Sequence, residues 1–253
     1  MRRWMLAGNW KMHNTIQDSV ALARAIVGGT EGVDGGDVVI APVFTALVSV
    51  KEVIKGSGVA LSGQDVFYEE KGAFTGEIAP AMLKDAGCEF VIIGHSERRK
   101  YFHETDETVN AKVKKALSSG LKPIMCVGET EEEREKGITE FVVGLQVKKG
   151  LYGIEDLSNV TIAYEPVWAI GTGKNATPEQ AEAVHAFIRR IVKDAYGQAA
   201  AGNTRILYGG SVTPENIGQL IAMEDIDGAL IGGASLKSES FIGIIKTVAG
   251  RCG

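Results

Sequence analysis

The amino-acid sequence predicts one α/β domain, residues 1–253, folded as a (β/α)8 barrel. Eight short, β-rich apolar runs recur along the chain, and helical patterns separate successive runs. Strands joined by helices run parallel, because a crossover of this length returns the chain to the same end of the sheet. An open doubly wound sheet would also satisfy this rule. Eight such units in 253 residues favour the closed barrel, and no composition shift or linker divides the chain.

The eight runs have the character of strands that are covered on both faces. Several are apolar on both sides instead of alternating with polar residues, as buried parallel strands do. Turn residues follow each run. We predict strands at Trp4–Trp10, Val38–Pro42, Val59–Gln64, Phe90–Gly94, Pro123–Val127, Val160–Tyr164, Arg205–Tyr208 and Gly228–Ile231.

Capping signals and apolar stripes predict the helices between the strands. The run Thr177-Pro178-Glu179-Gln180 supplies an N-cap threonine, a proline at the first helical position and a glutamine that completes a capping box. Thr130 with Glu133 forms a second capping box, and Thr213-Pro214 is expected to begin another helix. Apolar residues recur at spacings of three and four, as one face of a helix requires. The stripes are Ala181, Val184, Ile188, Ile191 and Ala195; Ile217, Leu220 and Ile221; and Val109, Val113 and Leu117.

The composition excludes several classes of protein. Hydrophobic residues make up 45% of the chain and charged residues 23%, and 27 Lys+Arg against 32 Asp+Glu give a net charge of −5. A disordered chain would have fewer apolar residues and a larger net charge. A protein whose main task is nucleic-acid binding would need a basic face. No apolar run approaches the roughly 20 residues of a membrane span.

Cysteine and histidine positions argue against a disulfide framework and a metal site. Cys88, Cys126 and Cys252 are odd in number and form no CxxC pair, and the four histidines form no metal-ligand pattern. The apolar stretch Trp4–Gly8 is too short for the core of a signal peptide. We therefore expect a protein of the reducing cytoplasm that binds neither a metal nor a membrane.

Polar and charged residues gather after the C-terminal ends of the predicted strands. In a parallel barrel these ends share one face, where barrel active sites lie. Turns alone explain some of these residues, but they poorly explain a lysine, a histidine and a glutamate that are each flanked by apolar residues. The residues concerned are Asn9, Lys11, Gln64, Asp65, His95, Glu97, Glu129, Glu165, Ser211, Gly232 and Gly233.

Five segments, in order along the chain, resemble the motifs of the triosephosphate isomerase family. They are Ala7–Met12 (AGNWKM), Gly94–Arg99 (GHSERR), Ala163–Gly173 (AYEPVWAIGTG), Tyr208–Ser211 (YGGS) and Leu230–Ser235 (LIGGAS). The resemblance spans nearly the whole chain. It implies a TIM barrel that interconverts dihydroxyacetone phosphate and glyceraldehyde 3-phosphate through an enediolate, in glycolysis and gluconeogenesis, without a cofactor. Two small departures are Asp65, where the family usually has asparagine, and the loop exit Lys174–Ala176.

A proton transfer between adjacent carbons requires a base at carbon, an electrophile at oxygen and a positive charge beside the enediolate. The resemblance gives these roles to Glu165, His95 and Lys11. Burial makes a carboxylate more basic, the N-terminal end of the helix expected after the histidine disfavours a charged imidazole, and a lysine supplies a fixed cation. Asn9 is expected to support the substrate oxygens and to order Lys11, and Glu97 to position Lys11.

The phosphate of the substrate is expected to bind backbone N–H groups. Gly232 and Gly233 follow the last strand and precede a single helical turn, whose free N–H groups and dipole favour an anion. Glycines also allow the phosphate to approach the backbone closely. By analogy with the family, Gly171 and Ser211 complete the cage.

The segment Pro166–Ala176 is predicted to be a lid that closes over the substrate and keeps water from the enediolate. Stiff residues begin it, and small apolar residues form its tip. The resemblance assigns Glu129 to holding the lid, and Tyr208 and Ser211 to bonding it when it is closed. Cys126, within a strand, is expected to be core packing beside the base.

Two alternative functions remain open at this point. Another phosphosugar-binding barrel isomerase would share the anchor of Gly232 and Gly233 but would lack the combined set of motifs. A ligand-binding or structural barrel would carry apolar or neutral residues at Lys11, His95 and Glu165.

The connection Asp65–Glu77 is unusually long for a βα loop, where about two to six residues are common. It carries Phe67, Tyr68 and Phe74, and an apolar protrusion of this kind usually marks an interface. The resemblance supplies a second copy of the chain as the partner. We therefore expect a homodimer formed through residues 65–77, in which Thr75 braces the catalytic residues of the neighbouring subunit.

Overall fold

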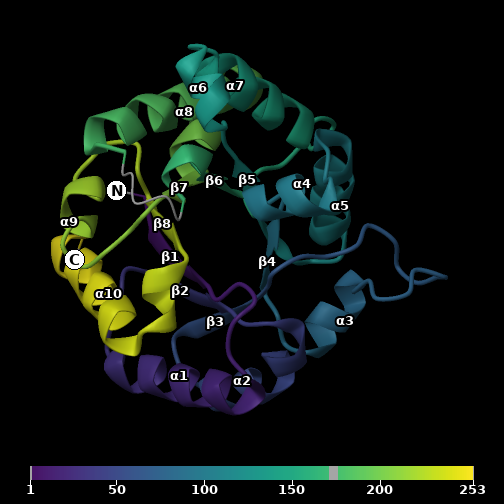
Figure 1. Ribbon diagram of the computed structural model, residues 1–253, viewed down its shortest axis with the longest axis vertical. Helices are drawn as coiled ribbons and strands as arrows, with labels where there is room; N and C mark the ends of the chain where they lie inside the picture. The colour runs from purple at the N-terminus through teal and green to yellow at the C-terminus, as the bar shows by residue number, and fades with distance from the viewer. Residues whose placement is uncertain (1, 171–175, 253) are drawn as a thin grey trace.

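The computed structural model, which describes residues 2–170 and 176–252, is a closed barrel of eight parallel strands surrounded by helices (Figure 1). The strands follow one another around the barrel in chain order, and β8 pairs with β1 to close it. The predicted barrel is therefore confirmed, and each predicted strand lies within two residues of an observed strand at both ends. The strands are β1 (Trp4–Asn9), β2 (Gly36–Ala41), β3 (Val59–Gly63), β4 (Phe90–Ile93), β5 (Lys122–Val127), β6 (Thr161–Tyr164), β7 (Arg205–Tyr208) and β8 (Gly228–Ile231).

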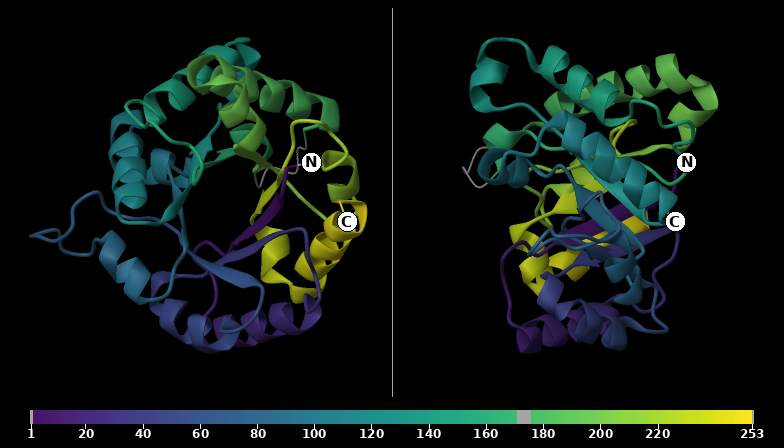
Figure 2. Two further views of the ribbon diagram at one scale, coloured as in Figure 1. Left: turned by 180° about the vertical axis from the view of Figure 1, so that it is seen from behind. Right: turned by 90° about the vertical axis from the view of Figure 1, so that its right-hand side faces the viewer.

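Helices fill the connections and form the outer layer of the barrel (Figure 2). Among the described residues, no helix is both long and apolar enough to cross a membrane. The helices are α1 (Ile16–Gly29), α2 (Leu47–Ile54), α3 (Pro80–Asp85), α4 (Ser96–Phe102), α5 (Asp106–Ser118), α6 (Glu131–Glu135), α7 (Thr139–Gly150), α8 (Pro178–Asn203), α9 (Ile217–Leu220) and α10 (Ser238–Cys252), with 3-10 turns at Phe44–Ala46, Val167–Ala169 and Gly233–Leu236.

Two of the three helix starts predicted at threonines are correct. Thr177 and Thr130 each cap their helix, and each forms the expected reciprocal bonds with the residue three positions later. The start predicted at Thr213-Pro214 is wrong, because α9 begins only at Ile217. The Asn216 Oδ1 accepts a hydrogen bond from the Thr213 N–H at 2.8 Å, and this bond holds the intervening residues in a turn.

The strands bury both faces, as their composition predicted. In β5, Ile124 and Cys126 belong to the cluster that fills the inside of the barrel, whereas Met125 and Val127 belong to the cluster between the sheet and the helices. This alternation follows from the two-residue repeat of a strand. Cys126 is fully buried, which agrees with its expected role in core packing.

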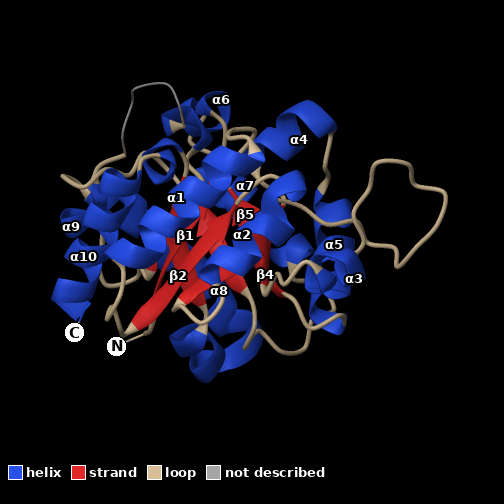
Figure 3. Ribbon diagram, turned by 90° about the horizontal axis from the view of Figure 1, so that it is seen from below, coloured by secondary structure: helices blue, strands red, loops and turns tan. Residues whose placement is uncertain are grey.

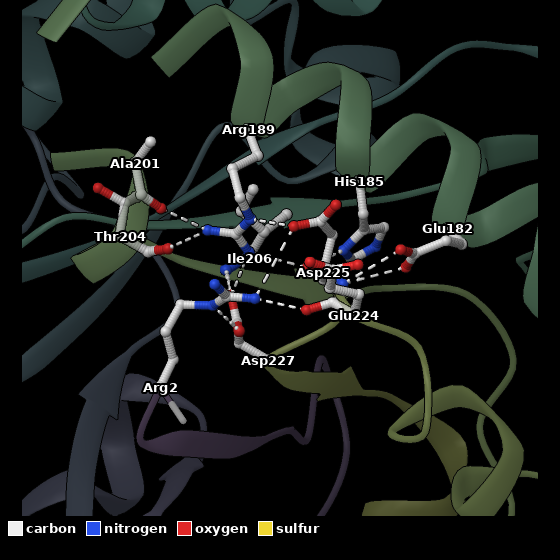
Figure 4. Close-up of polar contacts among 10 residues, drawn as sticks. All are labelled: Arg2, Glu182, His185, Arg189, Ala201, Thr204, Ile206, Glu224, Asp225 and Asp227. Carbon is white, nitrogen blue, oxygen red and sulfur yellow. Dashed lines mark hydrogen bonds and ion pairs between the residues drawn. The ribbon is translucent and has the colours of Figure 1, made fainter. Parts of the chain in front are cut away.

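The barrel closes at Asp227, the residue that precedes β8 (Figure 4). Its backbone N–H donates to Ile206 O at 2.9 Å, and its carbonyl oxygen accepts from the Met5 N–H at 3.0 Å. Its side-chain Oδ2 accepts from Arg189 Nη2 at 2.7 Å and from the Ile206 N–H at 2.8 Å, while Arg2 pairs with Oδ1. One aspartate therefore joins β7, β8, β1 and α8.

His185 lies on the same helix as Arg189 and is completely buried beside this junction (Figure 4). Burial lowers the pKa of its imidazole to about 3. The ring is therefore uncharged at neutral pH, with Nδ1 3.3 Å from Asp225 O. Because the unfolded chain binds this proton more readily, the free energy of unfolding falls as the pH drops below the ordinary histidine value of about 6.5.

The connection between β3 and α3 projects from the barrel as a long loop (Figures 1 and 3). The Phe67 ring lies 4.3 Å from the Tyr68 ring and 4.7 Å from the Phe74 ring, measured between centroids. Asp65, at the start of the loop, is buried and ion-paired with Lys112 at 2.7 Å. The projecting loop is therefore ordered by its own aromatic residues and anchored to the barrel at its base.

Replacing Gly228 with alanine should strongly destabilise the fold. Gly228 has a φ of 140°, and a Cβ there would stand 1.9 Å from Met5 O, inside the β1–β8 seam. We expect Gly228→Ala to lower the free energy of unfolding by more than about 3 kcal/mol, measured by urea denaturation. Gly28→Ala is the matched control, because a Cβ at Gly28 in α1 meets open space, and it should change stability by less than about 1 kcal/mol. A Gly228→Ala protein as stable as this control would contradict the conclusion that the β1–β8 seam has no room for a side chain at position 228.

Candidate active site

A cavity of about 410 Å³ opens at the C-terminal ends of the strands. The structure gathers most of the predicted site residues around it. Tyr208 is buried and Thr75 lies on the projecting loop, so neither lines the cavity, and Gly171 lies outside the described residues. The predicted residues that do line it are Asn9, Lys11, His95, Glu97, Glu165, Ser211, Gly232 and Gly233.

A larger hollow of about 740 Å³ lies at the opposite end of the barrel, where the strands begin. Its arginines are neutralised by neighbouring carboxylates. Arg3 and Arg205 both pair with Asp37, at 3.0 and 2.5 Å, and Arg2 pairs with Asp227. The smaller cavity is therefore the better candidate for an active site, because it is lined by a histidine, a lysine and the buried carboxylate of Glu165.

The carboxylate of Glu165, directly after β6, is only 2% exposed. Its Oε1 lies 2.9 Å from His95 Nε2, and its Oε2 accepts the Ser96 N–H at 2.9 Å. The Ser96 hydroxyl donates to Oε1 at 3.1 Å. Burial raises the pKa of Glu165, but the charge of His95 and these hydrogen bonds outweigh it, so that the pKa lies below its ordinary value. The carboxylate is therefore charged at neutral pH.

The backbone around Glu165 extends the sheet beyond the last strand residues. The Glu165 N–H donates to Val127 O at 2.7 Å, and the Gly209 N–H donates to Tyr164 O at 2.7 Å. A Cβ at Gly209 would stand 2.8 Å from Glu165 Cγ. Glycine is therefore required beside the carboxylate, since a side chain there would displace it.

His95 is the N-cap residue of α4, and its ring points at Glu165. Its Nδ1 accepts the Glu97 N–H at 3.2 Å, so the proton of the neutral ring is on Nε2. Burial lowers the pKa of His95, but the neighbouring Glu165 charge and hydrogen bond reverse the effect, and the pKa is raised. The helix end was predicted to disfavour the imidazolium form. In this structure the Glu165 carboxylate instead favours the imidazolium form, because it raises the pKa of His95.

Lys11 adopts a left-handed backbone conformation, with a φ of 52°. Two bonds hold it there: its N–H donates to Asn9 Oδ1 at 3.0 Å, and its carbonyl oxygen accepts from Gln64 Nε2 at 2.8 Å. Its Nζ donates to Glu97 Oε1 at 2.6 Å, and its Cε would stand 3.3 Å from a Cβ at Gly232. The lysine stem therefore passes close to the backbone that follows β8.

The backbone after β8 is open toward the cavity. Gly233–Leu236 forms a 3-10 turn, closed by the Ser235 N–H, which donates to Gly232 O at 2.9 Å. Apart from Gly233 itself and its two chain neighbours, no described residue has an atom within 4 Å of the position that a Cβ at Gly233 would take. Ser211 reaches the same cavity from the loop after β7.

Glu129 is fully buried and holds the first part of the predicted lid. Its Oε1 accepts from Tyr164 Oη at 3.1 Å, from Trp168 Nε1 at 3.0 Å and from Arg134 Nη1 at 3.2 Å. Burial raises the pKa of Tyr208 to about 12, and its hydroxyl has no hydrogen-bond partner among the described residues. Residues 171–175 of the predicted lid lie outside the described residues, so the contact expected between Tyr208 and the lid is not tested.

Ser96, Gln64 and Gly209 contact the predicted catalytic residues, although no such contact was predicted for them. Ser96 and Gly209 lie inside the GHSERR and YGGS motifs, and their membership of those motifs was the available signal. The bond from Gln64 to the Lys11 carbonyl oxygen has no local signal, because it joins residues 53 positions apart. Among the described residues, no group of three His, Cys, Asp or Glu is arranged to hold a metal ion.

Comparisons with known proteins show which proteins this chain is similar to. The family model described as triosephosphate isomerase matches residues 4–248. A triosephosphate isomerase of Carboxydothermus hydrogenoformans is 56% identical over 248 residues, which cover 97% of this chain and 99% of the relative. Those of Chlorobium phaeobacteroides (53% over 250 residues, 97% of this chain and 99% of the relative) and Prosthecochloris aestuarii (56% over 247 residues, 97% and 98%) are similarly close.

Removing the Ser96 hydroxyl should raise the pKa of the Glu165 carboxyl. Ser96→Ala deletes one of the bonds that favour the charged form and leaves the Ser96 backbone N–H in place. Glu165 now stabilises the fold at pH values above its ordinary pKa, and this stabilisation is lost as the pH falls through the folded-state value, so the loss should begin at higher pH in the variant. Carbon-13 NMR titration of the glutamate carboxyls measures the shift. Ser118→Ala, on the surface of α5, is the control, and an unchanged Glu165 titration in Ser96→Ala would contradict the interpretation.

Proposed function

We propose a catalytic mechanism and an assembly for this chain, which belongs to the triosephosphate isomerase family. It is an aldose–ketose isomerase that interconverts dihydroxyacetone phosphate and glyceraldehyde 3-phosphate, a reaction of glycolysis. The match over residues 4–248 leaves nothing in favour of another phosphosugar isomerase. What remains to be assigned is which residues carry out the proton transfer and how the substrate is held.

Glu165 is the base in this proposal. The observation that carries the assignment is its buried carboxylate, held 2.9 Å from His95 Nε2 at the cavity that also contains Lys11. Glu165 removes a proton from the carbon next to the substrate carbonyl and returns it to the former carbonyl carbon, while the hydroxyl proton passes between the two oxygens by exchange with His95. Since its charged form is already present at neutral pH, no other base has to activate it.

His95 is the electrophile, and its tautomer suits the role. The Glu97 N–H occupies Nδ1, so that Nε2–H is the only donor the neutral ring can offer to a substrate oxygen. In the structure Nε2 faces Glu165 instead. The Glu165–His95 contact must therefore break when substrate binds. The raised pKa of His95 depends on that contact, and after it breaks burial favours the neutral ring.

Lys11 and the backbone after β8 bind the charges of the substrate. The Lys11 ammonium lies beside Glu97 at the cavity and stabilises both the phosphate and the developing enediolate. Asn9 orders Lys11 through the bond to its N–H. Gly232, Gly233 and Ser211 supply the phosphate cage, and Gly171, outside the described residues, completes it by analogy with the family.

The segment 166–176 acts as the lid over this site. Glu129 anchors its start through Trp168, and by analogy with the family Tyr208 bonds the lid when it is closed. A closed lid excludes water, which strengthens the interactions of Lys11 with the enediolate and prevents loss of phosphate from it.

The active form is a homodimer joined through the loop of residues 65–77, and Thr75 of one subunit braces the site of the other. Phe74 is 43% exposed at the projecting end of the loop, and Met12, next to Lys11, is 92% exposed. Exposed apolar groups at a projection and beside an active site suit burial against a second copy. We also place the enzyme in the cytoplasm, where glycolysis runs and where the buried thiols of Cys88 and Cys126 stay reduced.

Shortening Glu165 to aspartate should abolish most of the turnover. The change keeps the charge but withdraws the carboxylate by on the order of 1 Å, and such a displacement can cost about a hundredfold in rate. We expect kcat to fall by roughly that factor with a modest change in KM, because the loss is in the transition state. A coupled assay of glyceraldehyde 3-phosphate isomerisation measures it, with exposed Glu132→Asp as the control. Near-parental turnover in Glu165→Asp would contradict the assignment of Glu165 as the base.

Replacing Phe67–Gly76 with a short Gly-Ser turn should give a folded but poorly active monomer. The root of the loop at Asp65 and its ion pair with Lys112 are kept, so the barrel should remain intact. Sedimentation of the parent protein at micromolar concentration should show a dimer. A parent protein that sediments as a fully active 26.9 kDa species would refute the shared-site dimer.

A further inference from the structure

Gly128 lies where strand β5 ends, directly against the backbone of Glu165. A Cβ at Gly128 would stand 1.7 Å from Glu165 O and 3.2 Å from Glu165 Cα. No side chain can occupy that space without moving either the β5 end or Glu165. The position of Gly128 therefore determines where the backbone of Glu165 can lie.

The residues on either side of Gly128 are bonded to the segment that carries Glu165. Val127 O accepts the Glu165 N–H at 2.7 Å, and Glu129 O accepts the Val167 N–H at 3.1 Å. Successive residues of an extended chain direct their polar groups to alternate sides, so Gly128 directs its own N–H and C=O away from Glu165. On that side β4 ends at Ile93, which pairs with Met125, and no strand reaches as far as Gly128.

The side chain of Gln146, from α7, takes the place of the missing strand. Its Oε1 accepts the Gly128 N–H at 2.7 Å, and its Nε2 donates to Gly128 O at 3.1 Å. A carboxamide is the neutral side chain that can offer an acceptor and a donor side by side, which is the pattern of a strand backbone. These two bonds hold Gly128 on the side of α7, and the Glu165 backbone packs against Gly128 on the opposite side.

We propose that Gln146 is a positioning residue for catalysis: it holds Gly128 so that Glu165 is placed within reach of the substrate carbon. The inference rests on the proposed role of Glu165 as the base. Gln146 does not line the substrate cavity, and it contacts neither His95 nor Ser96 among the described hydrogen bonds. Its effect is therefore on the location of the carboxylate and leaves the substrate-binding groups unchanged.

The test compares Gln146→Leu, Gln146→Glu and Gln146→Met with the parent protein in the coupled isomerase assay. Gln146→Leu and Gln146→Met remove both bonds at similar volume, while Gln146→Glu keeps an acceptor for the Gly128 N–H. We expect kcat to fall roughly ten- to a hundredfold in Gln146→Leu and Gln146→Met, with KM changed by less than about twofold. We expect Gln146→Glu to lose less activity than either of them. Inhibition by 2-phosphoglycolate, which resembles the enediolate, should weaken along with kcat, whereas inhibition by inorganic phosphate should stay unchanged.

Gln198→Leu, an exposed glutamine of α8, is the matched control and should retain parental activity. Circular dichroism at the assay temperature confirms that each variant is folded. Parental kcat in both folded Gln146→Leu and Gln146→Met would overturn the inference, as would a rise in KM with kcat unchanged. Glu165→Asp, assayed in parallel, distinguishes a failure of the positioning role of Gln146 from a failure of the base role of Glu165. If it loses activity while the Gln146 variants do not, only the positioning role fails, and if it too is active, the base assignment fails.

Discussion

The closure of the barrel at Asp227 is the constraint on which the rest of this structure depends. Its backbone joins β7 and β1, and its carboxylate receives Arg189 from α8 and the start of β7. Gly228, the next residue, allows the chain to enter β8 without a clash against Met5. A parallel sheet that closes on itself must bring every strand end to the same rim. The site residues meet only because this seam holds.

At that rim, the state of Glu165 is decided by competition between burial and hydrogen bonding. Burial alone would raise the pKa of this carboxyl. His95 and Ser96 overcome this by bonding the charged form from the start of α4. The charged form of Glu165 in this structure therefore depends on its contacts with His95 and Ser96.

Much of the fold was predictable from the sequence because its signals are local. Apolar runs marked the strands, and capping threonines marked α6 and α8. The error at Thr213 is also local: residues 214–216 form a turn, in which Asn216 Oδ1 accepts the Thr213 N–H, and α9 begins only at Ile217. Charged residues at strand ends located the site. The left-handed Lys11 and the effect of Glu165 on His95 could not be found in this way, since each depends on groups from a different strand.

Two glycines at the strand ends leave room for Glu165, because a side chain at either position would clash with it. Gly128 and Gly209 lie on opposite sides of Glu165, one after β5 and the other after β7. Gly128 also lies between two residues that bond to the Glu165 segment, and the second of these, Glu129, binds Trp168 of the lid through its side chain. A displacement of Gly128 would therefore shift Glu165 and Glu129 together. The amide of Gln146, bonded to both polar groups of Gly128, thus acts on the position of Glu165 and on the residue that binds Trp168.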